Sequence, residues 1–195
     1  MGRLLTLFVI FSFCTIDAFS QKLYEWKPPV VDFIVRNDVT FKDTVFLIIK
    51  DRRVKPSKLK SETYSEQITS SITNDIKKSF PRVVIIDRST PKEGSCNVLI
   101  NLASYGAGFG TEISAGVGIV GGNFGSFVFP KGKWNAITAL TSTILKPNTK
   151  ESKDFSSVSS KDNIWGYKSS RKALEETYSS TINQLLLFIE DSFTF

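Results

Sequence analysis

The feature that most constrains the fold is a strand–helix–strand pattern between residues 44 and 87. Thr44–Lys50 is nearly continuously apolar and rich in β-branched residues, which is typical of a buried strand. From Tyr64 to Phe80 an apolar side chain recurs at every fourth position, the spacing of one helix face, and Arg82–Ile86 is a second apolar run. A helical crossover is long enough to let its flanking strands pair in parallel. The segment therefore predicts a βαβ unit with its helix packed on one face of a sheet.

Two further strands and a second helix extend this unit. Cys96–Tyr105 alternates apolar and polar residues, and Trp134–Leu145 is rich in β-branched residues. Ser170–Phe193 carries an apolar stripe at helical spacing, while Val30–Val35 predicts a short edge strand. The polar residues 146–163 predict either a linker or an edge strand. Together these segments predict an α+β fold, a two-layer sandwich in which a mixed sheet of about five strands carries two helices on one face.

The N-terminus has the pattern of a secretory signal peptide. Arg3 precedes ten uncharged, mostly apolar residues (4–13), whereas a helix needs ~20 apolar residues to span a membrane. An Ala-Phe-Ser tripeptide ending at Ser20 favours cleavage after that residue. Cys14 offers an alternative, the lipidated N-terminal cysteine of a lipoprotein, although Phe13 is bulkier than the small residue usual before such a cysteine.

The expected organisation is a signal peptide at residues 1–20, an N-terminal extension at 21–43 and a single α+β domain at 44–195. Nine of the 12 glycines lie within residues 106–132, which predicts a glycine-rich hairpin between two antiparallel strands. Apolar residues among these glycines make the hairpin a candidate contact surface, and a pore-forming hairpin is the alternative. The candidate contact residues of this hairpin are Gly116, Gly118, Phe124 and Phe127.

The chain has no histidine, which excludes Ser-His-Asp and Cys-His catalysis and every histidine-ligated metal site. Glycines between residues 116 and 121 match the GxGxxG spacing of dinucleotide-binding loops. Further glycines and Pro130 follow, so the helix that this motif requires cannot begin there. We therefore expect no cofactor, no metal and no enzymatic activity.

Charged residues follow both strands of the βαβ unit. Asp51 and Arg53 follow the first strand and Asp87 follows the second, so parallel pairing would place all three at one edge of the sheet. We expect them to be structural anchors within an ion-pair network. A glycosidase-like pair of carboxylates, Asp51 and Asp87, is the alternative, but neighbouring arginines would keep both ionised and so oppose a general-acid role.

The loop that follows the first strand is basic. Residues 52–60 contain no acid, and the candidate contact residues are Arg52, Lys55, Lys58 and Lys60. Such a loop could contact anionic phospholipid, lipopolysaccharide or acidic glycan. We do not expect nucleic-acid binding, because the chain is predicted to be exported and this loop has no aromatic stacking platform.

Three features occur in a recognisable order: an apolar strand leading into Asp51-Arg52-Arg53, a strand with an N-terminal tryptophan at 134–143, and Asn163-Ile164-Trp165-Gly166 before the last helix. This order resembles that of small envelope lipoproteins of the YajG type and, more loosely, auxiliary lipoproteins of ABC-type transport systems. The resemblance implies a non-enzymatic accessory protein, exported by a Gram-negative-type bacterium to the periplasm, the outer membrane or the medium.

The same resemblance implies a class of partner. The partner would be another envelope protein or an anionic envelope component, with lipidation of Cys14 as the route to the membrane. The alternative function is an oligomerising subunit of a secretion or pore complex that uses the glycine-rich hairpin.

Overall fold

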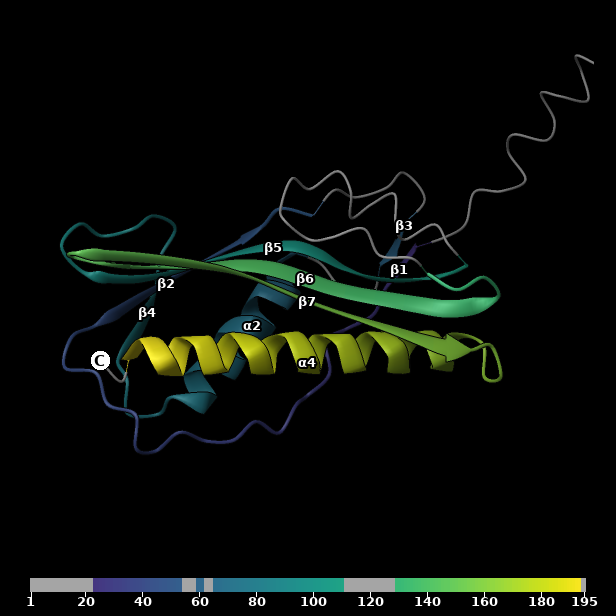
Figure 1. Ribbon diagram of the computed structural model, residues 1–195, viewed down its shortest axis with the longest axis horizontal. Coiled ribbons are helices and arrows are strands. Elements are labelled where there is room, and N and C mark those ends of the chain that lie inside the picture. Colours follow the sequence, from purple (N-terminus) through teal and green to yellow (C-terminus); the bar gives the residue numbers. More distant parts are fainter. Residues whose placement is uncertain (1–22, 54–58, 62–64, 111–128, 194–195) are drawn as a thin grey trace, which may run out of the picture.

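The computed structural model describes residues 23–53, 59–61, 65–110 and 129–193. These residues form seven strands and two helices (Figure 1). The elements are β1 (Leu23–Glu25), β2 (Val45–Asp51), β3 (Leu59–Ser61), α2 (Ser65–Ser79), β4 (Ile85–Asp87), β5 (Cys96–Phe109), β6 (Lys133–Lys146), β7 (Thr149–Asp162) and α4 (Tyr167–Phe193).

All seven strands belong to one mixed sheet built around the long strand β5. On one side, β5 pairs antiparallel with β6, and β6 pairs antiparallel with β7. On the other side, two strands share the edge of β5: β2 runs parallel to its first half, and β1 pairs antiparallel with it at Ala107. β4 and β3 complete this side, parallel to β2 and β1 respectively. The edge of β5 is therefore divided, with a joint just after Leu102, where β2 ends and the β5–β6 register shifts.

Both helices lie on the same face of the sheet, so the predicted two-layer α+β sandwich is confirmed (Figure 1). The main core lies between the layers, where the apolar stripes of α2 and α4 meet the inward side chains of β2, β5 and β6. β2 and β4 are parallel, as the βαβ unit predicts. The sheet has more strands than the expected five or so, because β1 and β3 have three residues each, too few to show a periodic pattern.

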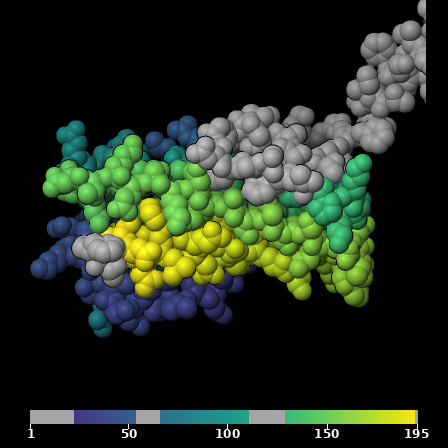
Figure 2. Space-filling view, in the orientation of Figure 1, coloured from purple at the N-terminus to yellow at the C-terminus, as the bar shows by residue number. Residues whose placement is uncertain are grey.

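Residues 26–44 run along the helical layer without forming a strand, so the edge strand predicted at Val30–Val35 is wrong. The Arg36 amide donates to the Ser79 carbonyl at 2.8 Å, which fixes this segment to the end of α2 instead of to the sheet. Some of its apolar side chains pack against the main core, whereas Ile34 is 79% exposed. Figure 2 shows the segment beside α4 on the surface of the molecule.

The polar stretch after residue 146 is an edge strand and not a linker. β7 covers 14 residues, and Phe155 is its one buried side chain. The Phe155 ring lies 5.6 Å from that of Phe188 on α4, measured between ring centroids. The rest of β7 is exposed or half-buried, and its serines and lysines obscure the alternation from which a strand is recognised.

The strands that flank the glycine-rich segment are antiparallel, as predicted, while its residues 111–128 lie outside the described part of the chain. One glycine of the segment has a clear packing reason. A Cβ at Gly106 would lie 3.2 Å from the Leu23 side chain, so glycine lets β1 lie close against β5. Gly110 and Gly132 have φ angles of 88° and 73°, which other residues rarely adopt.

A buried carboxyl joins the two helices. The Tyr178 hydroxyl on α4 donates to Asp75 Oδ2 on α2 at 2.7 Å, and both side chains are buried. Burial raises the pKa of Asp75 above its ordinary value of 3.8, and the hydrogen bond from Tyr178 and the charge of Lys78 oppose this rise only in part. The folded protein therefore favours the protonated form of Asp75 more than the unfolded chain does.

This raised pKa predicts a loss of stability as the pH increases. Between the ordinary pKa of an aspartate and its raised value, the folded state binds more protons, so the free energy of unfolding falls as the pH rises. We expect Asp75→Asn to remove this fall and to be at least as stable as the wild type at neutral pH. Urea denaturation at a series of pH values from 4 to 8 measures both effects. A less stable Asp75→Asn protein at neutral pH would contradict the assignment; Asp87→Asn, at an exposed carboxylate, is the control.

Candidate functional site

The predicted anchors Asp51 and Arg53 lie in a buried charge cluster at the joint in the sheet. The Arg53 guanidinium donates to both carboxylate oxygens of Asp51, at 2.8 and 2.7 Å. Its other terminal nitrogen lies 2.9 Å from Glu25 Oε2, and the Arg53 and Glu25 side chains are each 3% exposed. Glu25 ends β1 and Asp51 ends β2, so the guanidinium holds the two strands together where they share the edge of β5. We call Glu25, Asp51 and Arg53 the joint cluster.

The electrostatics of the joint cluster favour one fixed protonation state. Burial alone would lower the pKa of Arg53, but the hydrogen bonds and negative charges of Asp51 and Glu25 outweigh it and raise that pKa. Tyr105 lies beside Arg53, with its ring 6.0 Å from the guanidinium, and its hydroxyl donates to the Trp26 carbonyl at 2.8 Å. Burial raises the pKa of Tyr105. The cation and the neutral phenol therefore persist at any physiological pH, as suits a structural contact and not a proton transfer.

The third predicted anchor, Asp87, does not join this cluster. The parallel register places Asp87 beside Leu47, four residues before Asp51, which is about 13 Å along a strand. Asp87 instead accepts a hydrogen bond from Lys77 of α2 at 2.8 Å, on the surface. Paired glycosidase carboxylates stand about 5 to 9.5 Å apart, so Asp51 and Asp87 do not have the spacing of such a pair.

A shallow groove runs between α2 and the end of β2. One hollow, of about 460 Å³, is lined by Lys50, Asp51, Arg52, Glu66 and Thr69. A second hollow, of about 380 Å³, continues past Thr69 towards β4 and is lined by both partners of the Lys77–Asp87 ion pair. Arg52, a predicted contact residue, is exposed here. Because positive and negative groups alternate along the groove, it presents no single charge to a ligand.

Most other predicted contact residues lie outside the described part of the chain. This holds for the candidate lipidation site Cys14, for Lys55 and Lys58, and for Gly116, Gly118, Phe124 and Phe127. Lys60 lies in β3, which pairs with β1, but its side chain is not described.

Aromatic side chains gather at the end of the molecule where α4 begins. The Tyr24 ring contacts those of Trp26, Trp134 and Tyr167, with ring centroids 5.1 to 5.6 Å apart. The Trp26 indole donates to Ser170 Oγ at 2.9 Å, which ties β1 to the first turn of α4. The hydrogen bond between the Tyr24 and Tyr167 hydroxyls raises the pKa of Tyr24 to about 12.

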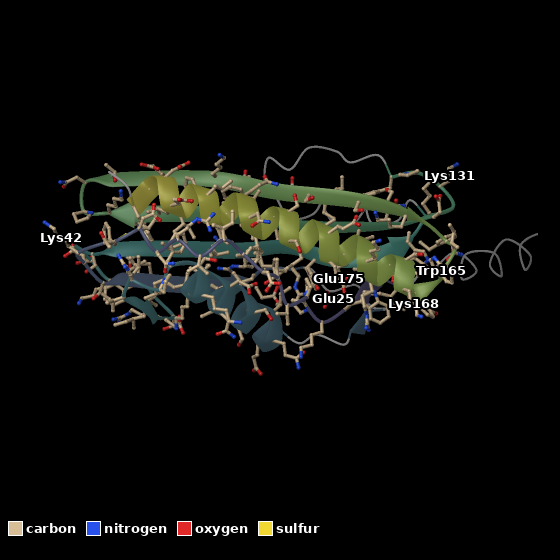
Figure 3. The ribbon with its side chains drawn as sticks, turned by 90° about the horizontal axis from the view of Figure 1, so that it is seen from below. Glu25, Lys42, Lys131, Trp165, Lys168 and Glu175 are labelled. Carbon is tan, nitrogen blue, oxygen red and sulfur yellow. The ribbon has the colours of Figure 1, made fainter. Side chains whose placement is uncertain are left out.

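The outer part of this aromatic group is exposed. Ile164, Trp165 and Tyr167 are 72%, 71% and 56% exposed, although they adjoin a packed cluster. Lys131 and Lys168 lie at the same end of the molecule, far from Lys42 at the other (Figure 3). We call these five residues the aromatic end face. Large apolar side chains exposed together with basic groups at one end of a molecule are typical of a contact site.

Sequence reasoning missed both Glu25 and the aromatic end face. Glu25 stands 28 positions before Arg53 in a segment interpreted as an extension, and no periodicity links the two. The structure places residues 23–25 within the sheet itself. The aromatic residues were visible as the Tyr-Glu-Trp and Asn-Ile-Trp-Gly-Tyr motifs, but only the fold brings these motifs together.

No family model matches the sequence, and no curated protein does. A crystal structure from Xanthomonas campestris, of a protein assigned to the family DUF330, is similar in fold: it has 10% identity, covers 87% of this chain and 99% of its own, and gives a TM-score of 0.52. The hypothetical protein CT253 from Chlamydia trachomatis has 10% identity, with 76% of this chain and 96% of its own chain covered, at a TM-score of 0.41. A PelC dodecamer from Paraburkholderia phytofirmans has 11% identity, with 87% of this chain and 97% of its own chain covered, at a TM-score of 0.39. The first of these similarities shows a shared fold.

Proposed function

We propose that the chain is an exported, non-enzymatic accessory protein of the cell envelope that works as a binding or assembly module. The observation that carries this proposal is the aromatic end face, where Trp165 and its neighbours are exposed although they adjoin a packed aromatic cluster. The sequence supports export through Arg3 and the apolar run at residues 4–13. The resemblance to YajG-type lipoproteins supports a place in the envelope.

The charged groups agree with this role. In the joint cluster, Arg53 is buried and compensated by two carboxylates, an arrangement that fixes strands. We propose that the partner is another envelope protein or an anionic envelope component, and that attachment to the membrane uses a lipid on Cys14.

Export is the part of the proposal that is simplest to test. The wild-type chain, expressed with a C-terminal tag in a Gram-negative host, should be accessible to protease added to spheroplasts. Val9→Arg interrupts the apolar run, so this variant should stay in the cytoplasm and resist the protease. A wild-type protein that remains in the cytoplasm would overturn the proposed function.

A second candidate function is an oligomerising subunit of an envelope complex. The observation that favours it is the outward-facing apolar pair Val30 and Ile34 on the N-terminal segment, 90% and 79% exposed. Large apolar side chains that project from a packed segment are typical of protein–protein contacts.

We expect Ile34→Asp to dissociate an oligomer formed through this segment, because it would bury an unpaired charge in the contact. Light scattering after gel filtration gives the mass, and Asn37→Asp adds the same charge at an exposed polar site nearby. If the glycine-rich segment forms the contact instead, Gly116→Asp dissociates the oligomer and Ile34→Asp does not. A monomeric wild-type protein would contradict this second candidate.

A further inference from the structure

The aromatic end face is held in an outward-facing position by its own turn. The Trp134 indole donates to Asn163 Oδ1 at 2.8 Å, which fixes the start of the turn between β7 and α4. The Trp165 amide donates to Ser169 Oγ at 3.4 Å, and Gly166 takes the φ of 54° that the turn requires. Trp165 is therefore presented to solvent by a defined backbone.

The charge around Trp165 is net positive. Residues 131–134 and 161–176 contain six basic residues and three acids, Asp162, Glu175 and Glu176. Asp162 is paired with Lys133 at 3.1 Å, and Glu176 is paired with Lys161 at 2.8 Å. Among the residues that the structure describes, neither the Lys131 nor the Lys168 ammonium forms an ion pair.

The position of these charges on α4 points in the same direction. The positive end of a helix dipole favours acids in the first turn, yet α4 has no acid there and has Lys168 instead. A basic residue at this position disfavours the helix slightly. Its presence is explained if it meets negative charge outside the protein.

The first described residue, Leu23, lies at this same end, and residues 1–22 precede it in the chain. Leu23 opens β1, and the next residue, Tyr24, contacts Trp134 and Tyr167 of the aromatic cluster. Leu23 lies nine positions after Cys14, and nine steps of fully extended chain span at most about 32 Å. A lipid on Cys14 would therefore hold the aromatic end face within that distance of a bilayer.

We propose that the aromatic end face docks on the surface of a membrane that contains anionic phospholipid. Trp165 and Tyr167 lie at the level of the headgroups, where tryptophan and tyrosine are enriched, and Ile164 reaches the outer acyl region. Lys131 and Lys168 contact the phosphates. The inference rests on the proposed function, since it names the partner of the same surface.

No helix among the described residues is long and apolar enough to cross a bilayer. The proposal needs no such helix, because the contact lies at the interface and involves side chains of one turn and one helix start.

Tryptophan fluorescence tests the docking in the protein as cells export it. The chain has three tryptophans, of which Trp26 and Trp134 are packed in the cluster and Trp165 is exposed. With vesicles of phosphatidylcholine and phosphatidylglycerol, brominated acyl chains should quench the wild-type emission and leave that of Trp165→Phe unchanged. Lys131→Gln and Lys168→Gln should each weaken the affinity for these vesicles about fivefold.

The outcomes separate docking from mere attachment. A lipid on Cys14 would bring the protein to any vesicle, but only docking places Trp165 within reach of the bromines. The proposal is overturned if the protein does not bind anionic vesicles, or if it binds them and Trp165 is not quenched. It is also overturned if Leu187→Gln, at an exposed apolar position elsewhere on α4, reduces quenching as much as Trp165→Phe does. Retention in the cytoplasm would overturn the proposed function independently of the vesicle result.

Discussion

Replacing Arg53 with methionine is expected to destabilise the protein by about 3 to 5 kcal/mol, because it leaves two buried carboxylates without their cation. The guanidinium lies within 2.9 Å of both Asp51 and Glu25, and its side chain is 3% exposed. Urea denaturation of the purified protein measures the change in the free energy of unfolding.

The neighbouring arginine provides a matched control. Arg52 is exposed, so Arg52→Met should change the free energy of unfolding by no more than about 0.5 kcal/mol. Adding Glu25→Gln and Asp51→Asn to Arg53→Met should recover part of the loss, because the unpaired charges are then removed. Equal effects of Arg52→Met and Arg53→Met would show that the joint cluster does not hold the sheet together.

Truncating Phe155 to alanine is the second change with a large expected effect, a loss of about 3 kcal/mol. Phe155 is 2% exposed and is the one buried side chain of β7, where it packs against Phe188 of α4. Without it, β7 keeps its hydrogen bonds to β6 but loses its apolar contact with the helical layer. Urea denaturation measures the loss, and amide exchange should show faster opening of β7 than of β5.

Val158 tests whether this effect is specific to the buried position. Val158 lies on the same strand and is 43% exposed, so Val158→Ala should cost no more than about 0.5 kcal/mol. If the two alanine variants are equally stable, the Phe155 side chain does not hold β7 to the helical layer.

Long periodic segments made the fold class predictable from the sequence. The apolar stripe on α2 shows the helical repeat, and the apolar run in β2 is typical of a buried strand. Both are buried as these patterns predict. The strand predicted at Cys96–Tyr105 continues to Phe109. The prediction ended too early because glycine and alanine in the second half of the strand hide the alternation. Cys96, the first residue of that predicted strand, is the buried first residue of β5.

The candidate sites were less predictable, because they depend on contacts between distant segments. Arg53 meets Glu25 only because β1 takes over the edge of β5 where β2 ends. β1 has three residues, too few to be recognised from their pattern. Trp165 was visible in the motif before the last helix, but its exposure beside a packed aromatic cluster follows from the position of Tyr24 against Tyr167.

The central claim, that the chain is exported to the envelope, is tested most directly by the intact mass of the protein recovered from membrane and soluble fractions. We expect a processed chain in an envelope fraction. Its mass should correspond either to a start at Gln21 or to a start at Cys14 with added acyl groups, and the second form would bring the aromatic end face close to the bilayer. Recovery of only an unprocessed chain that still begins with residues 1–20, from the cytoplasm, would contradict the account.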